Sequence, residues 1–473
     1  MWSEITNTVE DGNLGANTST ATHVQAKIGV SATKSSVPIL ITSTMKPDEI
    51  KAKLGLSPLA DACIDAAENG LKTIYAVPVI ADAEGEIGEV QKTGTSQGSF
   101  SVEGKPNNQY DIVVEIIESG NNNEGSFWYS IDGGNNFSEE YTIPLSGEFE
   151  LPGTGMVLKF TDSDTEDKSF LEGDAYSFQT VAPTMSNASV LKAVEGLLSF
   201  KKSLEMIHIV GTSGKALWAA LQAKAEVFQE EKKPVIFLCE ARSCRNDETL
   251  DEYETALEQE RKNISSRYIA VTPTYATYMR KDRRIQNINM AGVISGYIGK
   301  AKESLSVGCV EEFPISSTKL IKLLPEGIES HLKNLDAMGY TVIRDYTDLE
   351  DFYIANGNVM SPDGSDFKYI EHVRVLNRIV REINKLATMK LQQEIDPENY
   401  ESDIKAIEAY LNIAMDNAKN DKIISSGNVT IDTEDLNILA DEKLDVNATW
   451  VPMGTDRVIN ITFAVNNPAL AAN

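Results

Sequence analysis

Few residues of this chain have the types and spacing that chemistry requires. The segment Gly211-Thr-Ser-Gly-Lys215 lies between a predicted strand and a predicted helix, where backbone N–H groups could bind a phosphate. A phosphate-binding loop also needs a glycine five residues before Gly214 and a Ser or Thr after Lys215, but these positions hold Ile209 and Ala216. We therefore interpret the segment as an ordinary connection between a strand and a helix.

Metal-binding and nucleophilic patterns are also incomplete. Asp162, Asp164 and Glu166 are spaced like the start of a calcium loop, but Asp167 stands where such a loop needs a glycine. The histidines and cysteines show no spacing typical of a metal site or a catalytic nucleophile; they are His23, His208, His331, His372, Cys63, Cys239, Cys244 and Cys309. We expect no catalytic, metal-binding or cofactor-binding residue, and therefore a structural protein rather than an enzyme.

Length and charge narrow the class further. At roughly 150 residues per domain, 473 residues predict about three domains. Asp and Glu number 71 against 43 Lys and Arg, so the net charge of −28 disfavours binding to nucleic acid or to anionic membranes. The first 26 residues hold neither Lys nor Arg, and apolar runs stay far below the roughly 20 residues of a membrane span, so we expect no secretion signal and no membrane segment.

The elements that would position a site follow an α/β pattern that is interrupted once. Strands at 37–42 and 73–80 flank a helix at 58–68, and from 186 to 272 helices and strands alternate, which predicts a largely parallel sheet. Between 85 and 182, short alternating runs separated by Gly, Asn, Asp and Pro predict a sandwich or barrel. The predicted fold class is α/β (α+β overall), multidomain, with an inserted all-β domain and extended arms.

The C-terminal third is predicted to be mainly helical with short strands. Periodicity predicts helices at 328–338, 367–391 and 402–418, and strands at 340–345 and 352–355. The chain then closes with a predicted hairpin of 444–451 and 457–465, turned at 452–456.

Both ends of the chain are uncharged and extended. No charged residue occurs in 12–26 or in 458–473, and Ile459, Ile461 and Phe463 share one face of the last predicted strand. Proteins usually protect an edge strand with charges or proline, so such a strand indicates either cover by another chain or a place in its own sheet.

The helix at 367–391 carries a basic stripe in an otherwise acidic chain. The stripe consists of Arg374, Arg378, Arg381 and Lys385 at helical spacing. It predicts either a solvated face paired with acidic neighbours or a docking surface for an acidic partner.

The order of these parts, together with several short strings, resembles the sheath protein of contractile phage tails and related phage-tail-like particles. The strings are Lys27-Ile-Gly-Val30, Ser57-Pro-Leu-Ala-Asp-Ala62, Thr73-Ile-Tyr-Ala-Val-Pro-Val79, Ser130-Ile-Asp-Gly-Gly134, Ile143-Pro-Leu-Ser-Gly147, Gly173-Asp-Ala-Tyr-Ser-Phe178, Ala182-Pro-Thr-Met185, Ala291-Gly-Val-Ile-Ser-Gly-Tyr-Ile-Gly-Lys300, Gly339 to Asp345 and Phe367-Lys-Tyr-Ile-Glu-His-Val-Arg-Val375. The resemblance implies five parts: an N-terminal arm (1–26), an α/β body (27–84 and 183–345), an inserted β domain (85–182), a C-terminal sheath domain (346–456) and a C-terminal arm (457–473).

The resemblance implies a subunit that polymerises into stacked rings around an inner tail tube and contracts by rearrangement of its lattice. It implies that the arms add strands to neighbouring subunits, through Val458, Ile459, Ile461, Phe463, Val465, Leu14 and Val24. By the same resemblance the basic stripe is a candidate tube-facing surface. The implied partners are further copies of the chain, the tube protein, and baseplate and terminator proteins, with no cofactor, nucleic acid or membrane. The implied location is a phage tail, or a phage-tail-like or bacteriocin particle, assembled in the bacterial cytoplasm.

A surface adhesin or a surface-layer subunit, binding through the β domain, is the competing interpretation. Such proteins are secreted, and because we expect no secretion signal here, this interpretation is disfavoured.

Overall fold

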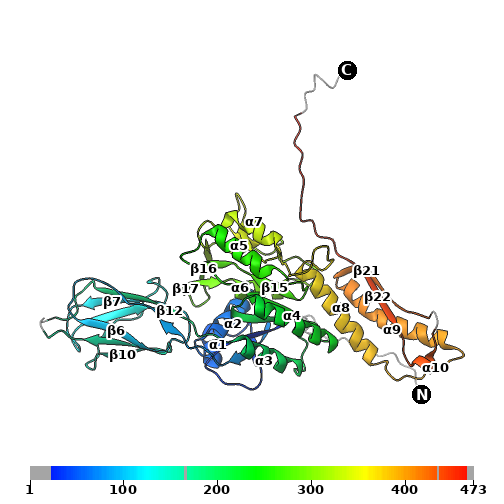
Figure 1. The fold of residues 1–473 in the computed structure, drawn as a ribbon, viewed down its shortest axis with the longest axis horizontal. Coiled ribbons are helices and arrows are strands. Elements are labelled where there is room, and N and C mark those ends of the chain that lie inside the picture. The colour runs from blue at the N-terminus through cyan, green and yellow to red at the C-terminus, as the bar shows by residue number, and fades with distance from the viewer. Residues whose placement is uncertain (1–22, 165–167, 434–435, 466–473) are drawn as a thin grey trace, which may run out of the picture.

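A computed structural model describes residues 23–164, 168–433 and 436–465 of the chain. Three regions follow one another along the long axis: a β domain at one end, an α/β body in the middle and a mainly helical C-terminal region at the other end (Figure 1). The predicted multidomain α/β fold with an inserted all-β domain is confirmed.

The body is built on a six-stranded sheet of order β15-β14-β13-β1-β3-β2. Neighbouring strands are parallel except for β2, which runs antiparallel to β3 at one edge. The strands are β1 (Val24–Val30), β2 (Ile39–Thr42), β3 (Thr73–Val79), β13 (Met206–Thr212), β14 (Ile236–Glu240) and β15 (Ile269–Thr272). Every residue of β1 and β14 is buried, as expected of parallel strands covered on both faces.

Helices cover both faces of this sheet. On one face lie α2 (Pro58–Glu68) and α6 (Ala291–Lys300), and on the other α3 (Asn187–Leu198) and α4 (Lys215–Glu230). The helix α2 begins where predicted because the Ser57 hydroxyl accepts the N–H of Ala60 and Pro58 occupies the first helical position. The remaining body helices are α1 (Pro47–Leu54), α5 (Leu250–Arg261) and α7 (Leu332–Ala337).

A small antiparallel sheet lies beside the body sheet, in a segment where the sequence analysis placed no strand. It consists of β16 (Tyr275–Met279), β17 (Ile285–Asn289) and β18 (Leu320–Leu324). The predicted strands at 340–345 and 352–355 are present as the antiparallel pair β19 (Ile343–Asp345) and β20 (Phe352–Ile354).

The segment between β3 and α3 forms two sheets with a core of their own. One sheet has the order β4-β12-β7-β8-β9 with β5 beside β12, and the other has the order β10-β11-β6. The core is rich in aromatic side chains, including Tyr110, Phe127 and Phe160. The strands are β4 (Glu86–Ile87), β5 (Gln91–Thr93), β6 (Ser99–Gly104), β7 (Asp111–Glu118), β8 (Ser126–Ser130), β9 (Tyr141–Thr142), β10 (Glu148–Leu151), β11 (Met156–Thr161) and β12 (Ala175–Val181).

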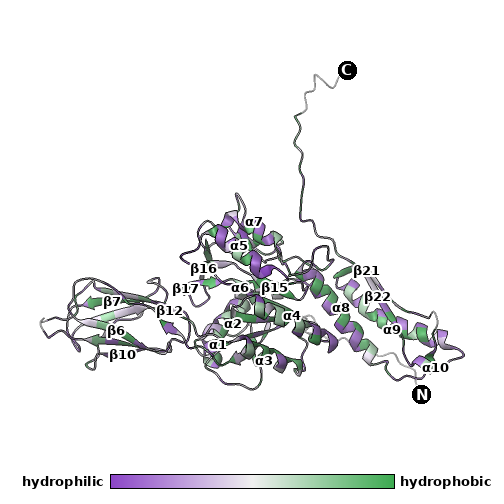
Figure 2. Ribbon diagram, in the orientation of Figure 1, coloured by the Kyte–Doolittle hydropathy of each residue, from purple (hydrophilic) through white to green (hydrophobic). Residues whose placement is uncertain are grey.

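The C-terminal region packs two long helices against a two-stranded sheet. Its elements are α8 (Ile370–Thr388), α9 (Tyr400–Asn420), β21 (Ile424–Ile431), α10 (Ile438–Asp441) and β22 (Val446–Pro452). Green and purple segments alternate along α8 and α9 in Figure 2, which is the pattern of amphipathic helices.

The predicted C-terminal hairpin is wrong. Residues 444–451 do contribute a strand, β22, but its antiparallel partner is β21 rather than 457–465. The strand β21 was missed because its sequence, Ile-Ser-Ser-Gly-Asn-Val-Thr-Ile, has few apolar residues and a central glycine. Residues 453–465 belong to no strand and run away from the domain as an extended segment (Figure 1).

The close approach of α2 to α6 depends on glycine. A Cβ atom added to Gly296 would lie 2.6 Å from Asn69 Cβ and 2.8 Å from the backbone oxygen of Ala66. We expect Gly296→Ala to lower the free energy of unfolding by about 1–3 kcal/mol, because the helices must separate. Gly196, in α3, has nothing within 4 Å of such an atom, so Gly196→Ala is the matched control and is expected to stabilise the protein by about 0.5–1 kcal/mol through helix propensity. Urea unfolding of both variants measures the two changes in free energy of unfolding. Equal changes would contradict a requirement for glycine at position 296.

Candidate functional site

The C-terminal segment 453–465 is the most exposed apolar part of the described chain. Val458, Ile459 and Ile461 are 76%, 74% and 69% exposed, and Phe463 and Val465 are 90% and 101% exposed. We call residues 458–465 the C-terminal arm. Its predicted apolar face, with Ile459, Ile461 and Phe463, is thus largely exposed.

The two residues predicted for strand exchange at the N-terminus, Leu14 and Val24, are not exposed like those of the C-terminal arm or are not described. Leu14 lies outside the described residues. The assignment of Val24 was wrong, because Val24 is the first residue of β1 and is 8% exposed. Since β1 is paired with β3 on one side and β13 on the other, it has no free edge for another chain.

The β21–β22 sheet has outer edges that no described strand covers. Among the described strands, β21 and β22 pair only with each other, so each has one edge without a strand partner. One face of the sheet packs against α9 through Ile424, Val429 and Ile431, which are buried. The outer edge of β21 is already bonded by α9, because the N–H and backbone oxygen of Val429 pair with Asn412 and the N–H of Ile431 donates to Glu408. The outer edge of β22 is therefore the one at which a further strand could be added.

The basic stripe on α8 does not form one exposed surface. Arg374 is 1% exposed, its Nε lies 2.6 Å from Glu205 Oε1, and its Nη2 donates to the backbone oxygen of Ala301. Arg378 forms ion pairs with Glu303, Glu382 and Asp421.

The other two residues of the stripe differ from each other. Arg381 donates to the backbone oxygen of Pro234, 3.0 Å away, whereas Lys385 is exposed. Three of the four predicted tube-facing residues are therefore engaged inside the subunit, and the tube contact stays a prediction for Lys385.

The ion pair of Arg374 with Glu205 is almost completely buried on both sides. Burial raises the pKa of Glu205, but the nearby Arg374 guanidinium and His23 outweigh burial and lower that pKa to about 2. The carboxylate is thus ionised at neutral pH, and both charges are satisfied in the interior.

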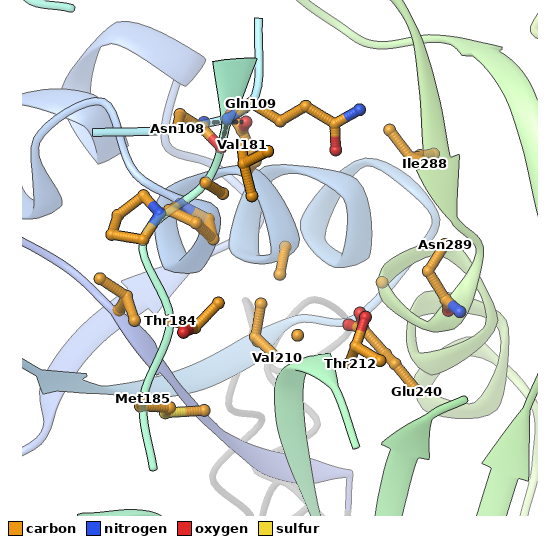
Figure 3. A pocket seen from close by; sticks show the side chains of 18 of the residues that line it. Asn108, Gln109, Val181, Thr184, Met185, Val210, Thr212, Glu240, Ile288 and Asn289 are labelled. Carbon is orange, nitrogen blue, oxygen red and sulfur yellow. Dashed lines mark hydrogen bonds between the residues drawn. The ribbon is translucent and has the colours of Figure 1, made fainter. Parts of the chain in front are cut away.

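A cavity of about 280 Å³ lies between the body and the base of the β domain (Figure 3). Val210, Thr212 and Glu240 line it from the carboxyl ends of β13 and β14, and Asn108 and Gln109 line it from the β domain. It is the place in an open α/β sheet where small ligands most often bind.

Behind this cavity a chain of polar side chains crosses the sheet. The Nζ of Lys27 lies 2.7 Å from Ser295 Oγ and 2.8 Å from His208 Nδ1, and His208 Nε2 lies 2.9 Å from Glu240 Oε1. Burial lowers the pKa of Lys27 to about 8 and raises that of Glu240 to about 7, while burial and Lys27 together lower the pKa of His208. Ser295, Lys27 and His208 are fully buried and do not line the cavity, so this chain holds strands together rather than presenting a nucleophile.

A buried ion cluster joins the β domain to the body. Asp61 Oδ1 lies 2.6 Å from Arg284 Nη2, while Asp61 Oδ2 lies 3.1 Å from Arg280 Nη1 and accepts a 2.7 Å hydrogen bond from Asn108 of the β domain. Burial opposes ionisation of Asp61, but both guanidinium groups outweigh it and lower its pKa to about 2. The sequence analysis missed this cluster because its members lie far apart; its one local signal is the charge-rich run from Arg280 to Arg284.

Metal and membrane sites are not found in the part of the chain that the structure describes. No group of three or more His, Cys, Asp or Glu side chains there could hold a metal ion; Glu166 of the acidic turn lies outside that part. No helix of the described segments is long and apolar enough to cross a bilayer.

Comparison with known families assigns the chain. The model of the DUF2586 N-terminal domain matches residues 2–358, and that of the DUF2586 C-terminal domain matches residues 366–470. The chain belongs to the DUF2586 family. The boundary between the two matches falls just before α8, the helix that begins the C-terminal region.

Individual relatives confirm the resemblance of this DUF2586 chain to tail sheath proteins. A protein of Haemophilus phage HP1 with the provisional name tail sheath protein is 21% identical, over 50% of this chain and 68% of the relative. The sheath tail protein of Desulfitobacterium hafniense has a TM-score of 0.50 and 12% identity, covering 95% of this chain and 100% of that one. A chain of the contracted baseplate of the anti-feeding prophage has a TM-score of 0.53 and 10% identity, covering 99% and 98%. The fold is thus shared along almost the whole chain.

We expect Asp61→Asn to lower the free energy of unfolding by about 3–5 kcal/mol at pH 7, because it removes the carboxylate that pairs with both buried Arg280 and Arg284. The pKa of Asp61, near 2 in the folded state, lies below its usual value of 3.8. Its contribution is therefore present above about pH 4 and is lost as the pH falls toward 2. Denaturant unfolding from pH 7 to pH 3 measures both effects.

Glu84→Gln is the control for this variant. Glu84 pairs with Lys105, and the two side chains are 64% and 68% exposed, so we expect no measurable change. An Asp61→Asn protein as stable as the Glu84→Gln protein would contradict the assigned role of the cluster.

Proposed function

We propose that this chain is the subunit of a tail sheath and polymerises into stacked rings around an inner tail tube. The exposed apolar C-terminal arm is the observation that carries the proposal. Eight mainly apolar residues that pair with no described strand favour a partner on another copy. The sheath-like fold and the phage relative support the same role.

In this proposal the arm of one subunit adds a strand to the β21–β22 sheet of a neighbour. Main-chain hydrogen bonds would complete the free edge, and Ile459, Ile461 and Phe463 would cover apolar surface of the accepting domain. The contact joins two different surfaces, so repetition produces rings or a helix rather than a closed dimer.

Contraction then needs no cofactor. Subunits assembled in an extended lattice of higher free energy would move as nearly rigid bodies into a contracted lattice of lower free energy. The arms would keep neighbours tethered while the contacts between bodies change. The exposed Lys385 is the remaining candidate of the basic stripe for contact with the tube.

The partners and location follow from the same proposal. They are further copies of the chain, an inner tube protein, and baseplate and terminator proteins, in a phage tail or phage-tail-like particle assembled in the cytoplasm of a bacterial host. The −28 net charge makes binding to host nucleic acid unfavourable.

Deletion of residues 458–473 is expected to leave a folded monomer that does not polymerise, because the donated strand is lost while the body core is untouched. Negative-stain electron microscopy, with and without the tube protein, and analytical ultracentrifugation measure the outcome. Normal tubes formed by the deletion variant would overturn strand exchange.

A pair of single substitutions tests which face of the arm is buried. Ile461→Asp places a charge on the apolar face and is expected to raise the concentration needed for polymerisation at least tenfold. Asn460→Asp, on the opposite face, is the matched control and is expected to assemble like the unmodified protein. Equal effects of the two substitutions would contradict strand addition with a buried face.

A further inference from the structure

Two residues near the start of α8 contact residues that lie close to the two ends of the chain. Glu371 and Arg374 are three positions apart on this helix, so they lie on neighbouring positions of one face. They are 2% and 1% exposed. Glu371 contacts the segment that leads into the C-terminal arm, and Arg374 contacts the residue that leads into β1.

The C-terminal segment is attached through Arg457. Its guanidinium donates to Glu371 Oε1 and Asn356 Oδ1, and it lies 3.5 Å from the centre of the Tyr369 ring. A cation held over an aromatic ring and paired with a buried carboxylate is fixed in position. Arg457 is also the last charged residue before the uncharged stretch 458–473.

The burial of Glu371 stabilises the contact with Arg457. Its other oxygen, Oε2, has no hydrogen-bond partner among the described residues. Arg457 is therefore the cation that pairs with this buried carboxyl group, and its release would leave Glu371 without that partner. The arm beyond this point is exposed, so Arg457 separates a fixed root from a free arm.

The N-terminal segment is attached through His23. The Nδ1 of His23 lies 2.9 Å from Arg374 Nη2 and 3.5 Å from Glu205 Oε2. Arg374 is itself fixed by Glu205 and by the backbone oxygen of Ala301. The residue that precedes β1 is thus joined to the same helix turn that binds Arg457.

We propose that the turn of α8 from Glu371 to Arg374 is a clamp that fixes and couples His23 and Arg457, the residues at the inner ends of the two terminal segments. Glu371 and Arg374 are then positioning residues for assembly, since they set where each arm begins without contacting a neighbour. The proposal rests on the sheath function proposed above. Residues 458–473 span at most about 55 Å when fully extended, so a fixed root limits which neighbour the arm can reach.

A spectroscopic measurement on the monomer tests the root independently of assembly. Spin labels are placed at Val458→Cys and Ser199→Cys in a background with Cys244→Ser and Cys309→Ser, and the distance between them is measured by pulsed electron paramagnetic resonance. We expect a narrow distance distribution in the parent protein and a broad one in Arg457→Ala. Lys405→Ala, which removes an exposed cation from α9, is the control and should leave the distribution narrow.

A second variant excludes a trivial loss of folding. Arg457→Ala with Glu371→Gln removes both charges, so no ionised carboxylate stays buried, and circular dichroism should match that of the parent. The distribution should nevertheless stay broad. A narrow distribution in either Arg457 variant would overturn the clamp.

Assembly measurements test the coupling of the two arms. Arg457→Ala and His23→Ala are each expected to raise the concentration needed for polymerisation, and the double variant should raise it by less than the product of the two factors, because both act through one turn. Effects that simply multiply would overturn the coupling. If the unmodified protein never polymerises, the sheath proposal fails, and the monomer distances still decide whether Arg457 fixes the root.

Discussion

The ion pair between Arg374 and Glu205 is the contact on which the arrangement of body and C-terminal region depends. Glu205 immediately precedes β13, a central strand of the body sheet, whereas Arg374 belongs to the first long helix of the C-terminal region. Removing either partner would leave a charge buried in the interior. The pair therefore fixes the direction of α8, and with α8 the positions of α9, β21 and β22.

The acidic net charge of the chain is related to the burial of several of its basic residues. Arg280, Arg284 and Arg374 are nearly inaccessible and are neutralised by carboxylates of the same subunit. Arg280 and Arg284 hold Asp61, which also accepts a hydrogen bond from Asn108 of the β domain, and Arg374 joins the C-terminal region to the body. Basic residues thus serve internal contacts to a greater extent than their pattern in the sequence indicates, and the exterior is left predominantly acidic.

Local patterns predicted most of the α/β body and the β domain, but not the sheet of β16, β17 and β18. Buried strands such as Val235–Glu240 and capped helices such as Pro58–Glu68 have periodicities that depend only on nearby residues. The predicted hairpin is wrong because 457–465 alternates but pairs with no described strand, while β21 has a weak pattern and pairs with β22. The ion pairs of the basic stripe could not be predicted because Glu205 and Glu303, the partners of Arg374 and Arg378, lie far away in the sequence. Contacts between distant segments leave no periodic signal.

The neck of the β domain allows this region to vary independently. The chain enters and leaves the domain at adjacent points, where Ala83 and Thr184 form an antiparallel bridge. The domain encloses its own aromatic core, and β3 and α3 on either side of the neck pack within the body. An exchange of the whole domain would therefore change what the outer end of the molecule displays without altering the register of the body sheet. Other domains could therefore be inserted between β3 and α3, in evolution or by protein engineering.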